Sequence, residues 1–200
     1  MPQNGKTTIN GKRVVLRSPV TGDAAEFTAV IHRSAQLNRG LASPPTTAKQ
    51  FEAFVKRNSH PDGACFLICR ADDGAVMGSI ALSQIFRGGF RSAYLGYQIG
   101  AEFARQGYMT EALQLMLRHA FVNLKLHRLE ANIQPNNAAS IALVKRAGFI
   151  KEGYSRRYLK ICGRWRDHER WAILVEDWRR IRVSSRTVVN TTNLRIDERL

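Results

Sequence analysis

The sequence predicts an α+β fold, with a mixed, mostly antiparallel sheet of six or seven strands flanked by about four helices. Several short segments alternate apolar and polar residues as strands do, and others repeat apolar residues at helical gaps of three or four. Three strand-like segments between residues 64 and 99 follow one another through short turns, which indicates an antiparallel meander. The meander and the lack of a GxGxxG motif argue against a dinucleotide-binding Rossmann fold.

The predicted elements are a strand, two helices, three strands, a helix, a strand, a helix and two strands. Their approximate ranges are 12–17, 23–31, 46–55, 64–70, 75–86, 92–99, 107–121, 128–134, 136–147, 149–161 and 163–175. Capping residues and turns mark their ends: Asp23 and either Thr46 or Thr47 are candidate N-caps. Asp72–Gly74 predicts a tight turn between two strands, and Gly148 predicts a left-handed helix end.

The stretch from Tyr94 to Asn123 carries the most information. Its first residues alternate as a half-buried strand, and from Met109 the apolar residues take helical spacing. A strand that ends in a turn containing Gly107 and runs into a helix leaves backbone N–H groups unpaired at the positive end of the helix dipole. This arrangement predicts an anion site of the kind that holds a pyrophosphate, although an ordinary strand–turn–helix corner would have the same pattern.

The composition fits one globular domain. The chain has 200 residues, of which 44% are apolar, enough for one core. We find no run of roughly eighteen apolar residues, and the first residues lack the apolar segment of a signal peptide. We place the domain at residues 12–182, between a flexible N-terminus (1–11) and a polar C-terminal tail (183–200). Three cysteines without metal-type spacing predict a reduced, cytoplasmic protein with no metal.

The formal net charge of +15 concerns partners rather than fold. Phosphorylated small molecules, acidic proteins and RNA all fit such a charge. A basic surface that is merely soluble fits it as well.

Five segments, in this order and spacing, resemble a known family. They are YLGYQIG (94–100), QGYMTEAL (106–113), HRLEANIQPNNAAS (127–140), GFIKEGY (148–154) and GRWRDHERWAIL (163–174). Together they resemble the acetyl-CoA-dependent N-acetyltransferases of the Gcn5-related (GNAT) superfamily, and more narrowly the ribosomal-protein alanine N-acetyltransferases of the RimJ type. The resemblance implies a GNAT fold whose sheet is splayed open between strands 92–99 and 128–134.

The resemblance also implies where acetyl-CoA binds. Pantetheine would pair with backbone near Gln98, Ile99 and Gly100, and the pyrophosphate would lie on the turn at 105–110. The implied cofactor-binding residues of that turn are Arg105, Gln106, Gly107, Tyr108, Met109 and Thr110. The family pattern Gln/Arg-x-x-Gly-x-Gly/Ala is matched only at its central Gly107, because Ala104 and Met109 depart from it. Asn137 would contact the pantetheine arm, and its competing role is to cap the following helix.

The implied reaction is direct attack of an amine on the thioester. Many relatives place a tyrosine where this chain has Val144, so Ser140 is left to meet the departing sulfur. A related alanine acetyltransferase type carries a glutamate, which can accept a proton, at the position that is Asn132 here. Asparagine cannot take a proton, and Glu130 is a nearby carboxylate. An α-amino group titrates near about 7.7–8.0 and lysine near about 10.4, a difference of roughly 3.4 kcal/mol. A site without a strong base therefore favours the N-terminal amine of a protein, and the resemblance implies a ribosomal protein with an alanine- or serine-type N-terminus.

Two other functions remain open. A small-molecule acetyltransferase acting on aminoglycosides or polyamines would favour an acidic pocket, whereas this chain has 16 acidic and 31 basic residues. A non-catalytic ribosome- or RNA-binding module is suggested by residues 151–186, where basic residues alternate with Tyr154, Tyr158, Trp165 and Trp171. Contact with rRNA can also accompany catalysis. We expect no membrane contact and either a monomer or a homodimer.

Overall fold

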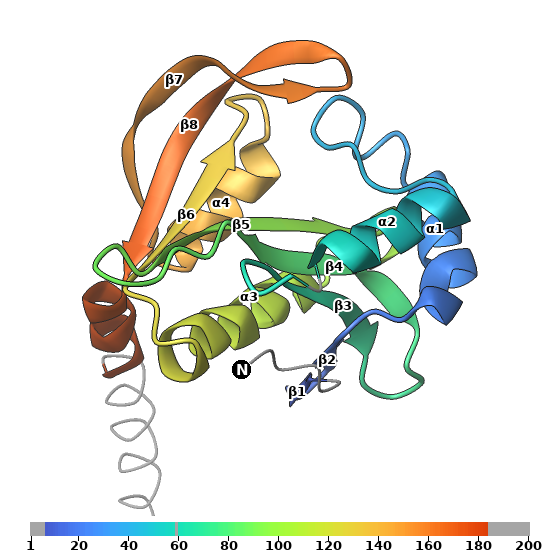
Figure 1. The fold of residues 1–200 in the computed structure, drawn as a ribbon, viewed down its shortest axis with the longest axis horizontal. Coiled ribbons are helices and arrows are strands. Elements are labelled where there is room, and N and C mark those ends of the chain that lie inside the picture. Colours follow the sequence, from blue (N-terminus) through green and yellow to red (C-terminus); the bar gives the residue numbers. More distant parts are fainter. Residues whose placement is uncertain (1–6, 59, 184–200) are drawn as a thin grey trace, which may run out of the picture.

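The computed structural model describes residues 7–58 and 60–183, which form one sheet with helices on both faces (Figure 1). Eight strands are ordered β1-β2-β3-β4-β5-β6-β8-β7. The strands are β1 (Thr8–Asn10), β2 (Val14–Arg17), β3 (Ala64–Arg70), β4 (Val76–Ser83), β5 (Ser92–Ile99), β6 (Arg128–Ile133), β7 (Ile150–Ile161) and β8 (Arg164–Leu174). The helices are α1 (Ala24–Arg33), α2 (Ala48–Asn58), α3 (Tyr108–Arg118) and α4 (Ala138–Arg146). The helical segments η1 (Thr21–Asp23), η2 (Ala101–Phe103) and η3 (His119–Asn123) are shorter, and residues 175–183 are also helical.

The predicted α+β class and mixed sheet are confirmed, since β5 and β6 pair in parallel and the other described strand pairs are antiparallel. The sheet has eight strands rather than six or seven, because residues 8–10 pair with residues 15–17 as β1. The sequence pattern alone assigns these residues to a flexible N-terminus outside the domain. The predicted tail at 183–200 lies, after residue 183, outside the described residues, as do residues 1–6.

The continuous apolar run in β3 follows from its position between two layers of helices. Leu67 and Cys69 pack with α1 and α2 through Phe27 and Phe51. Phe66 and Ile68 belong to the larger core on the other face, which α3 and α4 cover. A strand that is buried on both faces has no polar side to show, so its sequence does not alternate.

The sheet opens between β5 and β6, as the family resemblance implied. These two strands pair only at their first three positions, from Ser92 opposite Arg128 to Tyr94 opposite Glu130. Beyond Tyr94 the remaining half of β5 has β4 as its neighbour on one side, and on the side of β6 no described strand pairs with it. Figure 1 shows β1–β5 and the β6–β8 group diverging from this point.

The long loop between α1 and α2 reaches the β7–β8 hairpin (Figure 1). The Gln134 side chain, 6% exposed, donates from Nε2 to the Gly40 carbonyl at 2.8 Å. At the tip of the hairpin, the Cys162 N–H donates to Ser43 Oγ at 3.3 Å. The loop therefore bridges the two groups of strands that the splay separates.

Among the described residues, no helix combines the length and the apolar character that crossing a membrane requires.

Candidate functional site

The turn before α3 is built from backbone groups. Arg105 (φ 61°) and Gly107 (φ 86°) both adopt left-handed conformations, which a glycine accepts without steric penalty. The first hydrogen bond of α3 runs from the Glu111 N–H to the Gly107 carbonyl at 3.1 Å. The N–H groups of residues 107–110 precede that bond, so they have no acceptor within the helix. Together with the helix dipole they give this turn the geometry that the sequence predicted for an anion site.

Neighbouring side chains hold this turn in place. Arg13 donates from Nη1 to the Gln106 carbonyl at 3.1 Å, and its guanidinium lies 4.3 Å from the centre of the Tyr108 ring. Gln106 donates from Nε2 to the Glu102 carbonyl at 2.6 Å. The Glu111 carboxylate accepts from the Lys12 and Arg13 N–H groups at 2.6 and 2.8 Å. Glu111 therefore ties the β1–β2 connection to α3.

A pocket of about 530 Å³ lies against the turn. It is lined by Gly11, Lys12, Gly107, Thr110, Glu111, Gln114 and Leu115. The lining includes Gly107 and Thr110 of the turn, the basic residue Lys12 and the acidic residue Glu111, and Arg105 is exposed on the same turn. A polar, anionic group such as the diphosphate of a coenzyme fits these donors.

The open edge of β5 supplies further backbone groups. The Gly100 N–H donates to the Met77 carbonyl at 2.7 Å, so it faces β4. Because successive residues of a strand point their backbone groups to opposite sides, Gln98 also faces β4, whereas Tyr97 and Ile99 face the open edge. The Gln98 side chain donates to Ser79 Oγ at 3.2 Å. Of the three residues predicted for the pantetheine contact, only Ile99 turns its backbone to the opening, and Tyr97 joins it.

Gly100 also has a packing role. A Cβ atom at this position would lie 2.7 Å from Val30 Cγ1 and 3.1 Å from Phe103 Cδ2. The absence of a side chain at residue 100 therefore lets α1 approach the end of β5.

Ser140 and Asn137 lie together at the start of α4. Asn137 Oδ1 accepts from the Ser140 N–H at 3.1 Å, so the helix-capping role that competed with ligand contact is present. The Tyr97 hydroxyl is buried on the same face of the sheet and has no hydrogen-bond partner among the described residues. Burial raises the pKa of Tyr97 to about 12, an effect that the adjacent Ser140 hydroxyl partly offsets. Sequence analysis missed Tyr97, because an aromatic residue in an alternating strand is most simply read as core.

Glu130 and Asn132 occupy the opposite face of β6. Their neighbours Leu129, Ala131 and Ile133 point into the core, so strand alternation turns Glu130 and Asn132 away from α4. The Glu130 carboxylate accepts from Arg128 Nε at 2.9 Å. Asn132 Oδ1 is buried without a hydrogen-bond partner in the part of the chain that the structure describes. The predicted catalytic residues therefore lie on two faces of the sheet, with Ser140 on one and Glu130 and Asn132 on the other.

His168 of β8 is a second residue that sequence analysis missed. Arg170 is paired with Asn132 across β6 and β8, and by strand alternation His168, two residues earlier, shares that face. It is 3% exposed, and its Nδ1 lies 3.0 Å from the Arg166 carbonyl. This contact assigns the proton to Nδ1 and leaves Nε2 as an acceptor. Burial lowers the pKa of His168 below its ordinary value, so the ring is neutral at pH 7.

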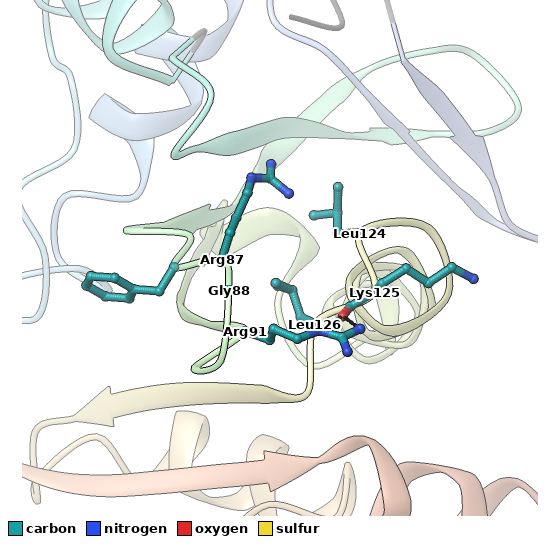
Figure 2. Close-up of a pocket in the computed structure, with 7 residues that line it drawn as sticks. Arg87, Gly88, Arg91, Leu124, Lys125 and Leu126 are labelled. Atoms are coloured by element: carbon teal, nitrogen blue, oxygen red, sulfur yellow. Dashed lines mark hydrogen bonds between the residues drawn. The ribbon is translucent and has the colours of Figure 1, made fainter. Parts of the chain in front are cut away.

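A smaller pocket of about 130 Å³ lies at the other end of β5, beside the β4–β5 turn and the segment that leads into β6 (Figure 2). Arg87, Arg91 and Lys125 surround it, and Arg91 Nε donates to the Lys125 carbonyl at 2.8 Å. The pocket includes none of the predicted site residues. Within residues 7–58 and 60–183, no cluster of His, Cys, Asp or Glu side chains has the arrangement of a metal site.

Comparisons with known proteins agree with this architecture. A profile of the acetyltransferase (GNAT) domain matches residues 13–150. The chain is 39% identical over 129 residues to the Bacillus subtilis (strain 168) protein named "Probable N-acetyltransferase YjcK", a match that covers 64% of this chain and 71% of that one. It is also 39% identical over 121 residues to the [Ribosomal protein uS5]-alanine N-acetyltransferase of Escherichia coli (strain K12), covering 60% of this chain and 62% of that one.

A solved structure shows the same fold with a coenzyme A derivative. RimJ of Mycobacterium smegmatis in complex with CoA-disulfide superposes with a TM-score of 0.78 at 28% identity, covering 86% of this chain and 88% of that one. The splayed sheet, the N–H groups at the start of α3 and these matches lead to one conclusion: the chain belongs to the GNAT family of N-acetyltransferases.

Proposed function

We propose that this protein transfers the acetyl group of acetyl-CoA to the N-terminal α-amine of a ribosomal protein with an alanine- or serine-type N-terminus. The diphosphate would lie on the N–H groups of residues 107–110, and the pantetheine arm along the open edge of β5 near Tyr97 and Ile99. Arg105 adds a positive charge beside the diphosphate. The similarity to ribosomal-protein alanine N-acetyltransferases supports this substrate class.

The observation that carries the choice of amine is the position of Glu130. Its carboxylate is held by Arg128 at 2.9 Å, and Arg128 also binds Glu152, so Glu130 is committed to an ion pair. Asn132, at the family's position for a base, cannot accept a proton. An α-amino group titrates near about 7.7–8.0, so a sizeable minority is neutral near neutral pH, whereas lysine at about 10.4 is almost wholly protonated and needs a strong base.

The two faces of the opening divide the chemistry between them. The amine would arrive on the side of Asn132. The buried Oδ1 of this residue has no partner among the described residues and can accept a hydrogen bond from the amine. The amine nitrogen attacks the thioester carbonyl carbon, the carbon–sulfur bond breaks, and the electron pair passes to sulfur. The nitrogen gives up one proton to solvent water as the amide forms. The Ser140 hydroxyl, on the other face, would donate a hydrogen bond to that sulfur. A thiol titrates near about 8.5, so a hydrogen bond suffices to stabilise the leaving group.

Mass spectrometry of ribosomal-protein N-termini from cells with and without this chain tests the proposal. We expect one or a few N-termini that begin with alanine or serine to lose acetylation when the chain is absent. Purified protein should release CoA with peptides that carry a free N-terminal alanine or serine, and not with the same peptides when the N-terminus is blocked and a lysine is free. Turnover of the blocked lysine peptides, or of polyamines and aminoglycosides in place of free N-termini, would contradict it.

We also propose that the β7–β8 hairpin contacts rRNA near the substrate. Trp165 is 60% exposed and Tyr154 is 50% exposed, among several Arg and Lys residues. Trp171, in contrast, is 4% exposed under Lys145, and the Tyr158 ring packs 6.0 Å from His168. Of the four aromatic residues predicted for an RNA surface, only Trp165 and Tyr154 are therefore exposed. Trp165→Ala should weaken binding to a ribosomal RNA fragment, and that binding should fall steeply with salt. Salt-independent binding would argue against an RNA surface.

A further inference from the structure

The Tyr97 hydroxyl is an unexplained polar group in the interior. It is buried and makes no hydrogen bond of standard geometry within residues 7–58 and 60–183, although the Ser140 hydroxyl lies close enough to lower its pKa. Nearly all buried polar groups in proteins are paired. An unpaired buried hydroxyl destabilises the folded chain. Such a group calls for an explanation, and one explanation is a ligand that supplies the partner.

The position of Tyr97 points to the proposed acetyl-CoA as that ligand. The residue lies in the half of β5 that β6 does not pair, and its side chain packs against the core on the face of α4. Ser140 is its polar neighbour there, and Asn137 fixes the start of α4 by accepting from the Ser140 N–H. The tyrosine and serine hydroxyls therefore converge beside the opening in the sheet.

Helix α4 offers no other acid at this place. Val144 stands where many relatives have a tyrosine, and it is fully buried in the core. A hydroxyl that contacts the leaving sulfur must therefore come from Ser140 or from another element. Tyr97, on β5, supplies a phenol on the same face.

We infer that Tyr97 is a catalytic residue, whose hydroxyl donates a hydrogen bond to the departing sulfur of coenzyme A alongside Ser140. This inference rests on the proposed placement of acetyl-CoA in the opening between β5 and β6. As the bond from the amine nitrogen to the carbonyl carbon forms and the carbon–sulfur bond breaks, the electron pair goes to sulfur, which the two hydroxyls stabilise as a thiolate. The amine nitrogen gives up one proton to solvent as the amide forms, and the thiolate takes a proton from solvent after release.

The phenol keeps its own proton in this role. Burial raises the pKa of Tyr97 to about 12, whereas a thiol titrates near about 8.5. Transfer of the phenol proton to the thiolate is therefore uphill, and Tyr97 acts as a hydrogen-bond donor. The same argument explains why Tyr97 does not serve as a general base.

Tyr97→Phe provides the test, because it removes only the hydroxyl. We expect kcat to fall roughly 10- to 100-fold, the usual range for one hydrogen bond to a developing charge, and KM for acetyl-CoA to stay within about two-fold since the hydroxyl acts on the leaving group. The thiol of bound coenzyme A, titrated by its thiolate absorbance, should have a pKa roughly one unit higher than in the wild type. The melting temperature should not fall, since the hydroxyl that is lost had no partner.

Tyr94→Phe is the matched control. Tyr94 lies on the same strand but the opposite face, where neighbouring Tyr158 raises its pKa, and its removal should leave the pKa of the bound thiol unchanged. A Tyr97→Phe protein that binds coenzyme A with the wild-type thiol pKa would overturn the inference while the proposed function stands. If the wild-type protein gave no heat with acetyl-CoA in calorimetry, the proposed function itself would fail.

Discussion

The turn at residues 105–110 and the proposed reacting end, around Tyr97, Asn132 and Ser140, are built from different kinds of group. The turn presents backbone N–H groups, set by the left-handed conformations of Arg105 and Gly107. The reacting end uses side chains from β5, β6 and α4, of which two carry buried polar atoms without partners among the described residues. A turn that acts through backbone groups should tolerate changes of side chain such as Ala104 and Met109, whereas the proposed reacting end depends on particular functional groups.

The largest effect should come from changing the backbone conformation of the turn. Gly107→Val places a β-branched residue at φ 86°, where an L-residue is strained by roughly 1–2 kcal/mol or more. Relief of that strain would rotate the N–H groups away from the diphosphate. We expect KM for acetyl-CoA to rise roughly ten-fold or more, with kcat less affected, in steady-state assays.

Gly74→Val is the control for that experiment. Gly74 has a similar φ of 76°, and no described atom lies within 4 Å of the place that a Cβ would take there. It lies in the β3–β4 turn, away from α3. The variant should lose comparable stability in thermal unfolding and keep its KM for acetyl-CoA. An equal rise of KM in both variants would show that the effect of Gly107→Val is general destabilisation.

Side-chain changes at the reacting end should affect the acceptor amine instead. Asn132→Ala removes the buried Oδ1 acceptor and should lower kcat/KM for the peptide roughly ten-fold, the usual value of a hydrogen bond to a charged group. Glu130→Gln should change it by only about two-fold, because the carboxylate already pairs with Arg128 at 2.9 Å. Steady-state kinetics with the peptide at saturating acetyl-CoA measure kcat/KM for both variants. A large loss for Glu130→Gln together with loss of the acidic limb of the pH profile would instead identify Glu130 as the base.

A smaller effect is expected where a side chain only supports the turn. Arg13→Ala removes the donor to the Gln106 carbonyl and the cation over the Tyr108 ring. Such exposed contacts are worth about 0.5–1 kcal/mol, so KM for acetyl-CoA should rise by roughly two- to five-fold. Arg13→Lys restores the charge but not the planar stacking, and it should recover only part of the affinity. Full recovery with lysine would mean that charge alone matters at this position.

The smallest effect concerns stability and the buried histidine near the reacting end. Burial lowers the pKa of His168 in the folded protein, whereas in the unfolded chain it titrates near about 6.5. The unfolded state then binds more protons as the pH falls, so the free energy of unfolding should decrease from pH 7 towards pH 5. Denaturant titrations should show a weaker pH dependence for His168→Gln. We expect the pH dependence that remains in His168→Gln to come from His119, because burial also lowers the pKa of His119. An unchanged pH dependence in His168→Gln would contradict the assignment.

The turn of the proposed anion site could be predicted from sequence because it is local. A strand pattern, a glycine and a helix pattern within thirty residues fix where backbone N–H groups are left unpaired, and the structure has β5, Gly107 and α3 at those places. The cap at Asn137 and the left-handed Gly148 were predictable for the same reason. The pairing partner of Glu130 was not, because the ion pair with Arg128 depends on which side chains share a face of β6.

The sequence by itself determined the α+β class, the order of the elements and the turn at Gly107, because each depends on periodicity and turn chemistry among near neighbours. Only the tertiary structure decided that Tyr97 meets Ser140, that Asn132 and His168 share a face, and that residues 8–10 complete the sheet. Those contacts join residues that are far apart in the chain. They are set by the parallel pairing of β5 with β6 and by where that pairing stops, which no local pattern encodes.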